Sequence, residues 1–197
     1  MNTLRKMKKL TLHSLLPPAL AIAGLAGINS PAQAACYGYP ESTGCTIMNP
    51  VTGASTTGTC VGNLATGNII IAPSFCTNPA GSDLPSGACV IRGLGGADLV
   101  TPASNGFSMI LACGGGGNDQ IMGGSDNDVL LGEAGNDFIS GGGGTNLVQG
   151  GTENDTLLVG GSGFSAHNFN DGGTGKNVCQ KGQNGANAPG TCFIKLP

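Results

Sequence analysis

The stretch GGGGNDQIM-GGSDNDVLL-GEAGNDFIS-GGGGTNLVQ-GGTENDTLL, residues 114–158, consists of five nine-residue blocks that follow one another without an insertion. Glycine opens every block, the sixth place holds Asp or Asn, and the eighth place holds an aliphatic residue. A flexible glycine-rich linker needs no aliphatic side chain in a fixed phase, so the pattern argues against one. The sixth-place residues are Asp119, Asp128, Asp137, Asn146 and Asp155, and the eighth-place residues are Ile121, Leu130, Ile139, Val148 and Leu157.

The pattern G-G-x-G-x-D-x-U-x, with U a large aliphatic residue, resembles the calcium-binding repeats of the repeats-in-toxin (RTX) family, also called haemolysin-type repeats. The resemblance implies an all-β fold, a parallel β-roll or β-helix solenoid in which two blocks make one coil. Turns on the same side are then about eighteen residues apart, and calcium lies between consecutive turns of one side. In that family the repeats assist folding and secretion in toxins, proteases, lipases and adhesins.

The chemistry of the turns suits this metal. Calcium binds about six to eight oxygen ligands. Glycine adopts positive φ without steric cost, so glycine-rich turns expose carbonyl oxygens, and the sixth-place Asp adds a carboxylate. The metal-ligand candidates, chosen on the resemblance, are Gly114, Gly115, Gly117, Asp119, Gly123, Gly124, Asp126, Asp128, Gly132, Gly135, Asp137, Gly141, Gly142, Gly144, Asn146, Gly150, Gly151 and Asp155.

The two sides of such a coil are expected to differ. One side stacks the turns of Asp119, Asp137 and Asp155, so the best sites are predicted between neighbouring members of this stack. The other side stacks Asp128 and Asn146, and the amide brings an oxygen without a charge. Because residues 114–158 contain seven acidic residues and no Lys or Arg, the stacked carboxylates should repel one another unless a cation binds.

Three turn positions depart from the glycine pattern. Asp126 and Glu153 replace the fourth-place glycine, and Glu133 replaces the second glycine. A residue with a Cβ at these places is expected to adopt a strained backbone conformation. The acidic side chain either adds a ligand or compensates charge, and both alternatives remain open at this point.

Weaker blocks precede the regular ones. Cys89–Val100 (CVIRGLGGADLV) fits one repeat in which Leu94 replaces a glycine. Ala103–Leu111 (ASNGFSMIL) is degenerate, with Ser108 at the Asp place and Ile110 at the core place. We expect the coil to continue through both blocks, without full metal ligation.

Weaker blocks also follow. The block GGSGFSAHN has Ser165 at the Asp place and His167 at the core place, and GGTGKNVCQ has Asn177 and Cys179 at those two places. Weakened repeats commonly end a solenoid, so the predicted coil runs from about residue 91 to residue 180.

The first 34 residues are expected to be a secretory signal peptide. Basic residues occur between positions 5 and 9, an apolar run spans 10–27, and Ala32-Gln33-Ala34 offers a cleavage site. A membrane anchor is the alternative, but Pro17 and Pro18 interrupt an apolar run already short for a spanning helix. The predicted location is therefore secreted or extracellular, with the periplasm as an alternative.

All eight cysteines follow this leader, and an even number in an exported chain predicts four disulfides. Sequence does not fix the connectivity, and we expect sequence neighbours to pair, because each pair closes a short loop. A zinc site is disfavoured by the lack of a C-x-x-C pair. The expected pairs are 36–45, 60–76, 89–113 and 179–192.

The predicted organisation has four parts: signal peptide 1–34, a disulfide-stapled β and loop region 35–90, a calcium-binding β-roll 91–180 and a C-terminal cap or tail 181–197. In the second part, the runs at 46–48 and 68–71 are strand-like, and the region is expected to cap the open end of the solenoid. Without the leader, which carries four of the eight basic and none of the eleven acidic residues, the formal charge is −7. An acidic chain makes nucleic acid an unsuitable partner.

Three functions fit these observations. The first is a secreted calcium-binding structural or interaction module that folds when calcium binds. The second is a polysaccharide-acting β-helix enzyme, for which the candidates are Arg92, His167, Lys176 and the turn carboxylates. No Ser-His-Asp or paired-carboxylate constellation stands out, so an enzyme is the minor alternative.

The third is a surface-adhesion protein that contacts an extracellular protein or polysaccharide. Val129, Leu131 and Leu147 flank inward residues and, with Gln149, would form an outward apolar patch. The alternative is that the N-terminal region covers this patch.

Overall fold

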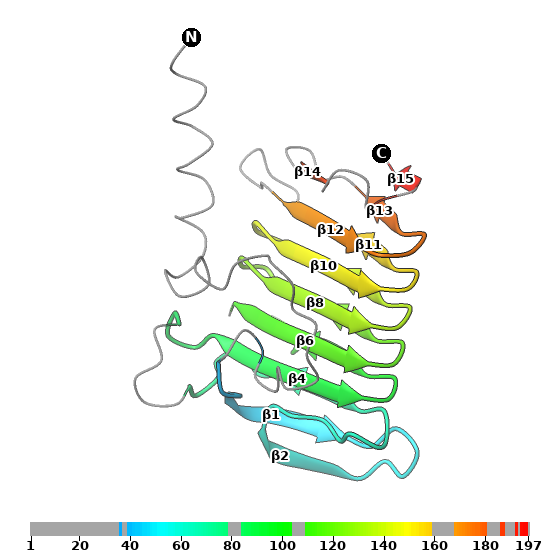
Figure 1. The fold of residues 1–197 in the computed structure, drawn as a ribbon. Helices are drawn as coiled ribbons and strands as arrows, with labels where there is room; N and C mark the ends of the chain where they lie inside the picture. Colours follow the sequence, from blue (N-terminus) through cyan, green and yellow to red (C-terminus); the bar gives the residue numbers. More distant parts are fainter. Residues whose placement is uncertain are drawn as a thin grey trace.

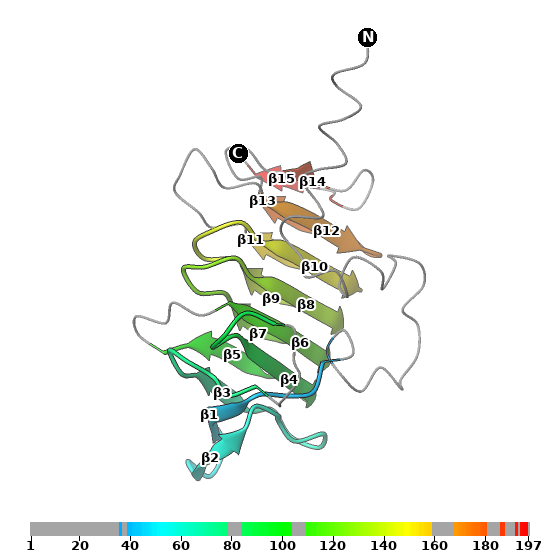
Figure 2. The same ribbon diagram turned by 90° about the vertical axis from the view of Figure 1, so that its left-hand side faces the viewer.

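Two β-sheets face each other and form a β-solenoid in the computed structural model of the chain (Figure 1). From β3 onward the chain alternates between the sheets, and Figure 2 shows each sheet as a ladder of strands. The predicted signal peptide lies outside the residues that the structure describes. Within the described part, no helix has the length and apolar character needed to cross a membrane. The structure describes residues 36, 39–78, 84–103, 109–158, 168–180, 186–187, 192 and 194–196.

Among the described residues, the larger sheet has nine strands in the order β15-β13-β11-β9-β7-β5-β3-β1-β2. From β3 onward, neighbouring strands are parallel, and β1 and β2 add an antiparallel hairpin at one end. The strands are β1 (Thr43–Met48), β2 (Ser55–Thr59), β3 (Ile69–Ala72), β5 (Leu99–Pro102), β7 (Gln120–Met122), β9 (Phe138–Ser140), β11 (Thr156–Leu158), β13 (Val178–Gln180) and β15 (Ile194–Leu196).

The smaller sheet has six strands within the described part of the chain, all parallel, in the order β14-β12-β10-β8-β6-β4. The predicted all-β parallel solenoid is therefore confirmed. The strands are β4 (Cys89–Gly95), β6 (Ile110–Gly116), β8 (Val129–Ala134), β10 (Leu147–Thr152), β12 (Phe169–Gly173) and β14 (Ala186–Asn187).

The eighth-place residues form the interior, as the pattern predicts. All five are fully buried, because alternate residues of a strand point to opposite faces and these face the opposing sheet. Val100 and Ile70 extend this row toward the N-terminal end, and Ile91 extends it in the opposing sheet. Each such side chain contributes about 1.5–3 kcal/mol by leaving water.

The block before the regular repeats has a different register from the one expected. Ile110 takes the Asp place, because its N–H donates to Asp128 Oδ1 at 2.7 Å, and Ala112 pairs with Leu130 at the core place. Ser108 lies outside the described residues. Ile110 and Ala112 both face inward, so apolar alternation alone could not tell which of them occupied the core place.

The block after the regular repeats also needs a correction. Asn146 donates its N–H to Asn168 Oδ1 at 2.7 Å, so Asn168, and not Ser165, takes the Asp place. Asn170 pairs with Val148 and takes the core place expected for His167. Ser165 and His167 lie outside the described residues. The separation of Asn146 from Asn168 is 22 residues, whereas regular turns are 18 apart, so an insertion displaced the pattern.

The next block is in the predicted register. Asp155 donates its N–H to Asn177 Oδ1 at 2.7 Å, and Cys179 pairs with Leu157. Parallel pairing then reaches β15. Coil formation therefore extends beyond residue 180 at this end and back to β3 at the other.

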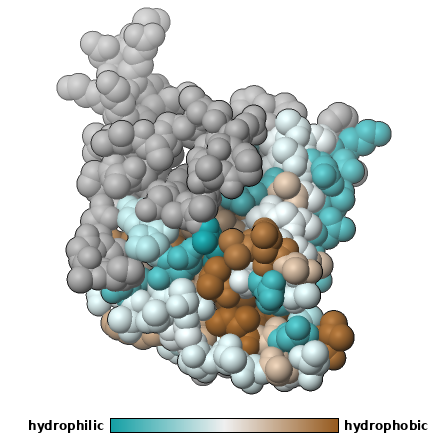
Figure 3. Space-filling model, turned by 60° about the horizontal axis from the view of Figure 1, so that its bottom comes forward, coloured by the Kyte–Doolittle hydropathy of each residue, from teal (hydrophilic) through white to brown (hydrophobic). Residues whose placement is uncertain are grey.

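The β1–β2 hairpin closes the N-terminal end of the larger sheet. β1 pairs with β3, with Ile47 opposite Ile70, and Ile47 packs partly buried against the core. Figure 3 views this end of the molecule and shows apolar surface on it. The hairpin and the neighbouring loops carry exposed apolar side chains at Val51, Leu64 and Phe75.

Four disulfides are present, and only one of the expected pairs, Cys179–Cys192, is correct. Two disulfides lie in the core at the N-terminal end, and a third joins the N-terminal segment to β6. The expectation failed because stacking, and not sequence distance, decides which cysteines meet. The other observed pairs are Cys36–Cys113, Cys45–Cys60 and Cys76–Cys89.

The segment that includes Cys36, Tyr39 and Glu41, here called the covering segment, packs on the outer faces of β4, β6 and β8 in the smaller sheet. A second buried cluster joins residues of this segment to outward side chains of β4, β6 and β8. Val129 and Leu131 belong to it and are 3% and 8% exposed. The predicted apolar patch is therefore covered at Val129 and Leu131, which removes the argument for an adhesion surface at these two residues, whereas Leu147 and Gln149 are partly buried. The cluster comprises Cys36, Tyr39, Leu84, Ala88, Val90, Leu111, Cys113, Val129 and Leu131, with Met109 and Leu147 packed against it.

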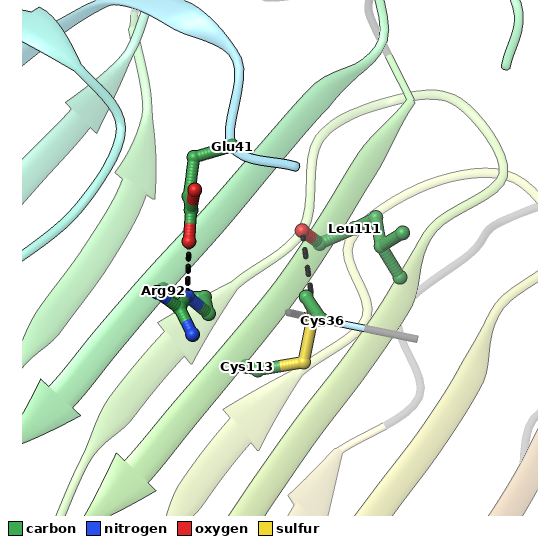
Figure 4. A network of polar contacts seen from close by, with 5 residues as sticks. All are labelled: Cys36, Glu41, Arg92, Leu111 and Cys113. Carbon is green, nitrogen blue, oxygen red and sulfur yellow. Dashed lines mark hydrogen bonds and ion pairs between the residues drawn. A yellow bond between two sulfur atoms is a disulfide. The ribbon is translucent and has the colours of Figure 1, made fainter. Parts of the chain in front are cut away.

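Polar contacts hold the same segment in place. Arg92 on β4 forms an ion pair with Glu41, and the Cys36–Cys113 disulfide lies on the neighbouring strand (Figure 4). Cys36 Sγ lies 3.8 Å from the Leu111 carbonyl oxygen. Arg92, which the sequence offered as a catalytic candidate, thus binds the covering segment to the sheet.

Candidate metal centre

The turns that lead from the smaller sheet to the larger one form one edge of the solenoid, here called the first edge. From the second turn onward, a buried Asp or Asn accepts a hydrogen bond through Oδ1 from the backbone N–H of the preceding member, at 2.7–2.9 Å. This ladder fixes each side chain from the coil before it. In order, its members are Asn68, Asp98, Asp119, Asp137, Asp155 and Asn177.

The four carboxylates of this ladder, Asp98, Asp119, Asp137 and Asp155, are called the aspartate column. Each is at most 2% exposed. Each also has a buried Oδ2 with no hydrogen-bond partner among the described residues. Leaving a buried acceptor without a donor costs about 1–3 kcal/mol, and more for a charged one. The column therefore presents a row of buried oxygens suited to a cation.

Backbone carbonyl oxygens converge on the same places. A Cβ built on Gly114 would lie 2.3 Å from Asp119 Oδ2 and 2.8 Å from the Gly132 carbonyl oxygen. A Cβ built on Gly132 would lie 2.1 Å from Asp137 Oδ2 and 2.5 Å from the carbonyl oxygen of Gly150. Only glycine fits such a position. Carboxylate and carbonyl oxygens of consecutive turns thus face one space, and these are the ligands that calcium prefers.

Residues with positive φ occupy the second and fourth places of the nine-residue blocks and orient these turns. Glu133 and Glu153 have φ of 77° and 80°, so the predicted strain is confirmed for both. Asp126, on the opposite edge, is not among the described residues with positive φ. An L-residue in this conformation costs about 1–2 kcal/mol. Leu94 also adopts it, with φ of 82°, and preserves the turn despite its side chain.

Burial governs the electrostatics of the column. It raises the pKa of Asp119 and of Asp155 to about 7, against the effect of a backbone N–H that lowers each pKa. The pKa of Asp137 is raised to about 6 for the same reason. Repulsion from Asp137 raises the pKa of Asp119 and of Asp155 further. A bound cation would oppose both effects, because it favours the ionised carboxylates.

The second edge, where the chain returns to the smaller sheet, carries less charge. Its buried ladder runs from Ile110 through Asp128 and Asn146 to Asn168. Both oxygens of Asp128 accept hydrogen bonds, and the donor to Oδ2 is Gly124 N at 2.7 Å. Burial raises the pKa of Asp128 to about 7. The two edges are therefore unequal, because the described residues place four buried carboxylates on the first and one on the second.

The structure places the predicted site residues at these two edges. Asp119, Asp137 and Asp155 come together in one stack, as expected. Gly123 and Gly141 form the equivalent cradle beside Asp128, and Asp126 is exposed. Among the remaining glycines, positive φ occurs at Gly115, Gly117, Gly135, Gly142, Gly144 and Gly151.

The sequence did not reveal the role that three members of the first-edge ladder play. Asp98 lies in a block in which Leu94 replaces a glycine, so full metal ligation was not expected there. Asn177 was assigned to the Asp place of its block, without a function. Asn68 was read as the beginning of a strand. The glycines at 62 and 67, close before Asn68, were the available signal, although their spacing departs from the repeat.

The candidate catalytic residues are not brought together within the described part of the chain. Arg92 lies on β4, at one end of the smaller sheet, whereas Lys176 lies two residues before β13, near the other end of the stack. Lys176 N donates to Asn154 Oδ1 at 2.8 Å in the stack of turns. His167 lies outside the described residues.

The fold and the first edge together define a β-solenoid with repeated turns that are lined by oxygen atoms. Residues 114–148 and 140–163 match the family model of the RTX calcium-binding nonapeptide repeat, in four-copy units. The match confirms the resemblance seen in the sequence and identifies this segment as RTX repeats. No curated protein and no solved structure matches the chain significantly.

Proposed function

We propose that the protein is a secreted structural module whose solenoid becomes stable when calcium binds along the first edge. The observation that carries this proposal is the aspartate column, in which the buried Oδ2 atoms of Asp98, Asp119 and Asp137 face carbonyl oxygens of the following turn. Asp119, Asp137 and Asp155 supply the charge, and Gly132 and Gly150 supply carbonyl oxygens. The other candidate glycines shape the turns that present these atoms.

The energetics of the column support dependence on a cation. Residues 93–175 contain no Lys or Arg, so no basic side chain of this stretch neutralises the stacked carboxylates. A ligand present at about 1,000 times its dissociation constant stabilises the native state by about 4 kcal/mol per site. Two or three occupied sites would match the total stability of many small domains, which is about 5–15 kcal/mol.

Export fits the same mechanism. The four disulfides suit an oxidising compartment, and RTX repeats with disulfide bonds are consistent with an extracellular location. A chain that needs calcium to fold would stay unfolded in a low-calcium cytoplasm and fold after export. The predicted leader at 1–34 would direct this export.

The test is a calcium titration of the purified, disulfide-bonded protein stripped of metal. Isothermal titration calorimetry measures binding, and far-UV circular dichroism measures the gain of β structure. We expect binding together with a gain of β structure or of stability against urea, and loss of both after chelation. Binding without any change in structure or stability would leave a calcium-binding protein but refute calcium-dependent folding.

Asp137→Ala and Asn146→Ala form a matched pair for the assignment of edges. Asp137 lies in the middle of the predicted stack and carries charge, whereas Asn146 lies on the second edge and donates Nδ2 to the Gly143 carbonyl oxygen at 2.8 Å. Calcium affinity should fall more in the Asp137 variant. Equal losses in both variants would contradict the assignment of calcium to the first edge.

A further inference from the structure

The turn 93–98 lies outside the matched repeats, yet it has the structure of the turns inside them. Asp98 is 2% exposed and is held through Oδ1 by Asn68, whose N and Nδ2 donate at 2.7 and 2.8 Å. Its Oδ2 is buried and has no hydrogen-bond partner within the described ranges. This atom is therefore presented in the same way as Oδ2 of Asp119.

A carbonyl oxygen also faces this turn from the following coil. A Cβ built on Gly93 would lie 2.2 Å from the Gly114 carbonyl oxygen and 2.3 Å from Asp98 Oδ2. The corresponding distances at Gly132 are 2.5 Å and 2.1 Å. Leu94 keeps positive φ, so the residue that breaks the sequence pattern does not change the turn.

We propose a further calcium site at this turn, formed by Asp98 Oδ2 and the Gly114 carbonyl oxygen, one coil before the matched repeats. This proposal rests on the proposed function, because it assigns the same ligand to a turn that the repeat pattern omits. The row of calcium sites would then be one site longer than the repeats at residues 114–158 predict.

The amides at the two ends of the ladder define where the column stops. A Cβ built on Gly62 would lie 2.3 Å from the Gly93 carbonyl oxygen and 2.7 Å from Asn68 Nδ2, so an N–H donor takes the place of Oδ2. Asn68 Nδ2 donates to the Thr66 carbonyl oxygen at 2.8 Å, and Asn177 Nδ2 donates to that of Gly172 at 2.7 Å. In these turns the side-chain amide N–H groups donate to the carbonyl oxygens, so these oxygens need no cation.

The same amides show how to remove the site without removing the fold. In Asp98→Asn, Oδ1 still accepts from Asn68, and Nδ2 replaces Oδ2 as it does at Asn68 itself. Asp171→Asn is the matched control, because it makes the same charge change on β12, where Asp171 Oδ1 accepts from Gly173 N at 3.0 Å. Circular dichroism in calcium verifies that both variants are folded.

Calcium stoichiometry, measured by equilibrium dialysis and calorimetry on the disulfide-bonded protein, is the readout. We expect Asp98→Asn to bind one calcium fewer than the unmodified protein and Asp171→Asn to bind the same number. If the unmodified protein binds calcium and Asp98→Asn binds as many ions with equal affinity, the further site is refuted and the proposed function stands. If the unmodified protein binds none, both proposals fail.

A second measurement does not depend on any variant. Crystals of the unmodified protein soaked with terbium, which replaces calcium at oxygen sites, should give an anomalous peak between Gly93 and Gly114. Peaks at the turns of Asp119 and Asp137 without one at the turn of Asp98 would refute the further site alone.

Discussion

Asp137→Asn separates the metal-binding role of the aspartate column from its structural role. The amide keeps Oδ1 as the acceptor for the Asp119 N–H, which is 2.8 Å away, and replaces Oδ2 by a donor near the Gly150 carbonyl oxygen. The structural ladder is therefore preserved, as it is at Asn68 and Asn177, while one charged ligand is lost.

The expected change has opposite signs with and without calcium. The pKa of Asp137 is raised from 3.8 to about 6, so at pH 8 its ionisation costs the calcium-free fold at most about 3 kcal/mol, at 1.36 kcal/mol per pKa unit. The amide removes this cost, so the calcium-free variant should be equally or more stable than the unmodified protein. In saturating calcium, the stabilisation produced by the metal should be smaller by about 4 kcal/mol for each site lost.

Urea unfolding at pH 8, in chelator and in millimolar calcium, measures both quantities. The decisive number is the difference between the two free energies of unfolding, compared between variant and unmodified protein. A variant that loses the same stability in chelator as in calcium would refute the reasoning, because Asp137 would then act only through the fold.

Four further outcomes follow from the structure. Between about pH 4 and 7 the calcium-free native state binds more protons than the unfolded chain, because burial raises the column's pKa values, so its stability should fall as pH rises; urea unfolding at pH 5 and pH 8 checks the sign. Leu130→Ala should cost about 2–5 kcal/mol in thermal or urea unfolding, and a smaller loss would mean that the core collapses around the gap. Glu133→Gly relieves positive φ and should stabilise by about 1 kcal/mol; destabilisation in calcium alone would instead make Glu133 a ligand. Replacing both Cys36 and Cys113 by Ser should lower stability by about 2–5 kcal/mol and increase binding of a hydrophobic dye, whereas unchanged dye binding would show that the covering segment stays in place.

The regular part of the fold was predictable because two signals coincide in it. The aliphatic residue at the eighth place sets the inward face, and the glycines set the turns, so the order of coils follows from counting. The stacking of Asp119, Asp137 and Asp155 required only that two blocks make one coil. Each of these features is local and repeats without an insertion.

Features that depend on insertions or on distant contacts were not predictable in this way. Extra residues before Asn168 displaced the register, and Ile110 and Ala112 are equally apolar candidates for one inward place. Cys36 meets Cys113 across a separation of 77 residues, which no local pattern encodes. The role of Asp98 was hidden by Leu94, since the sequence does not reveal that this leucine adopts the backbone conformation of a glycine.

The covering segment has a consequence for the order of folding. Cys36 and Tyr39 share one buried cluster with Leu111 and Val129, so the surface that receives the start of the described chain exists only after β6 and β8 have paired. Contacts between residues so distant in sequence carry a large loop-closure entropy and form late. The part of this segment that is synthesised first should therefore dock last, and a free Cys36 thiol would report that the central coils have not yet assembled.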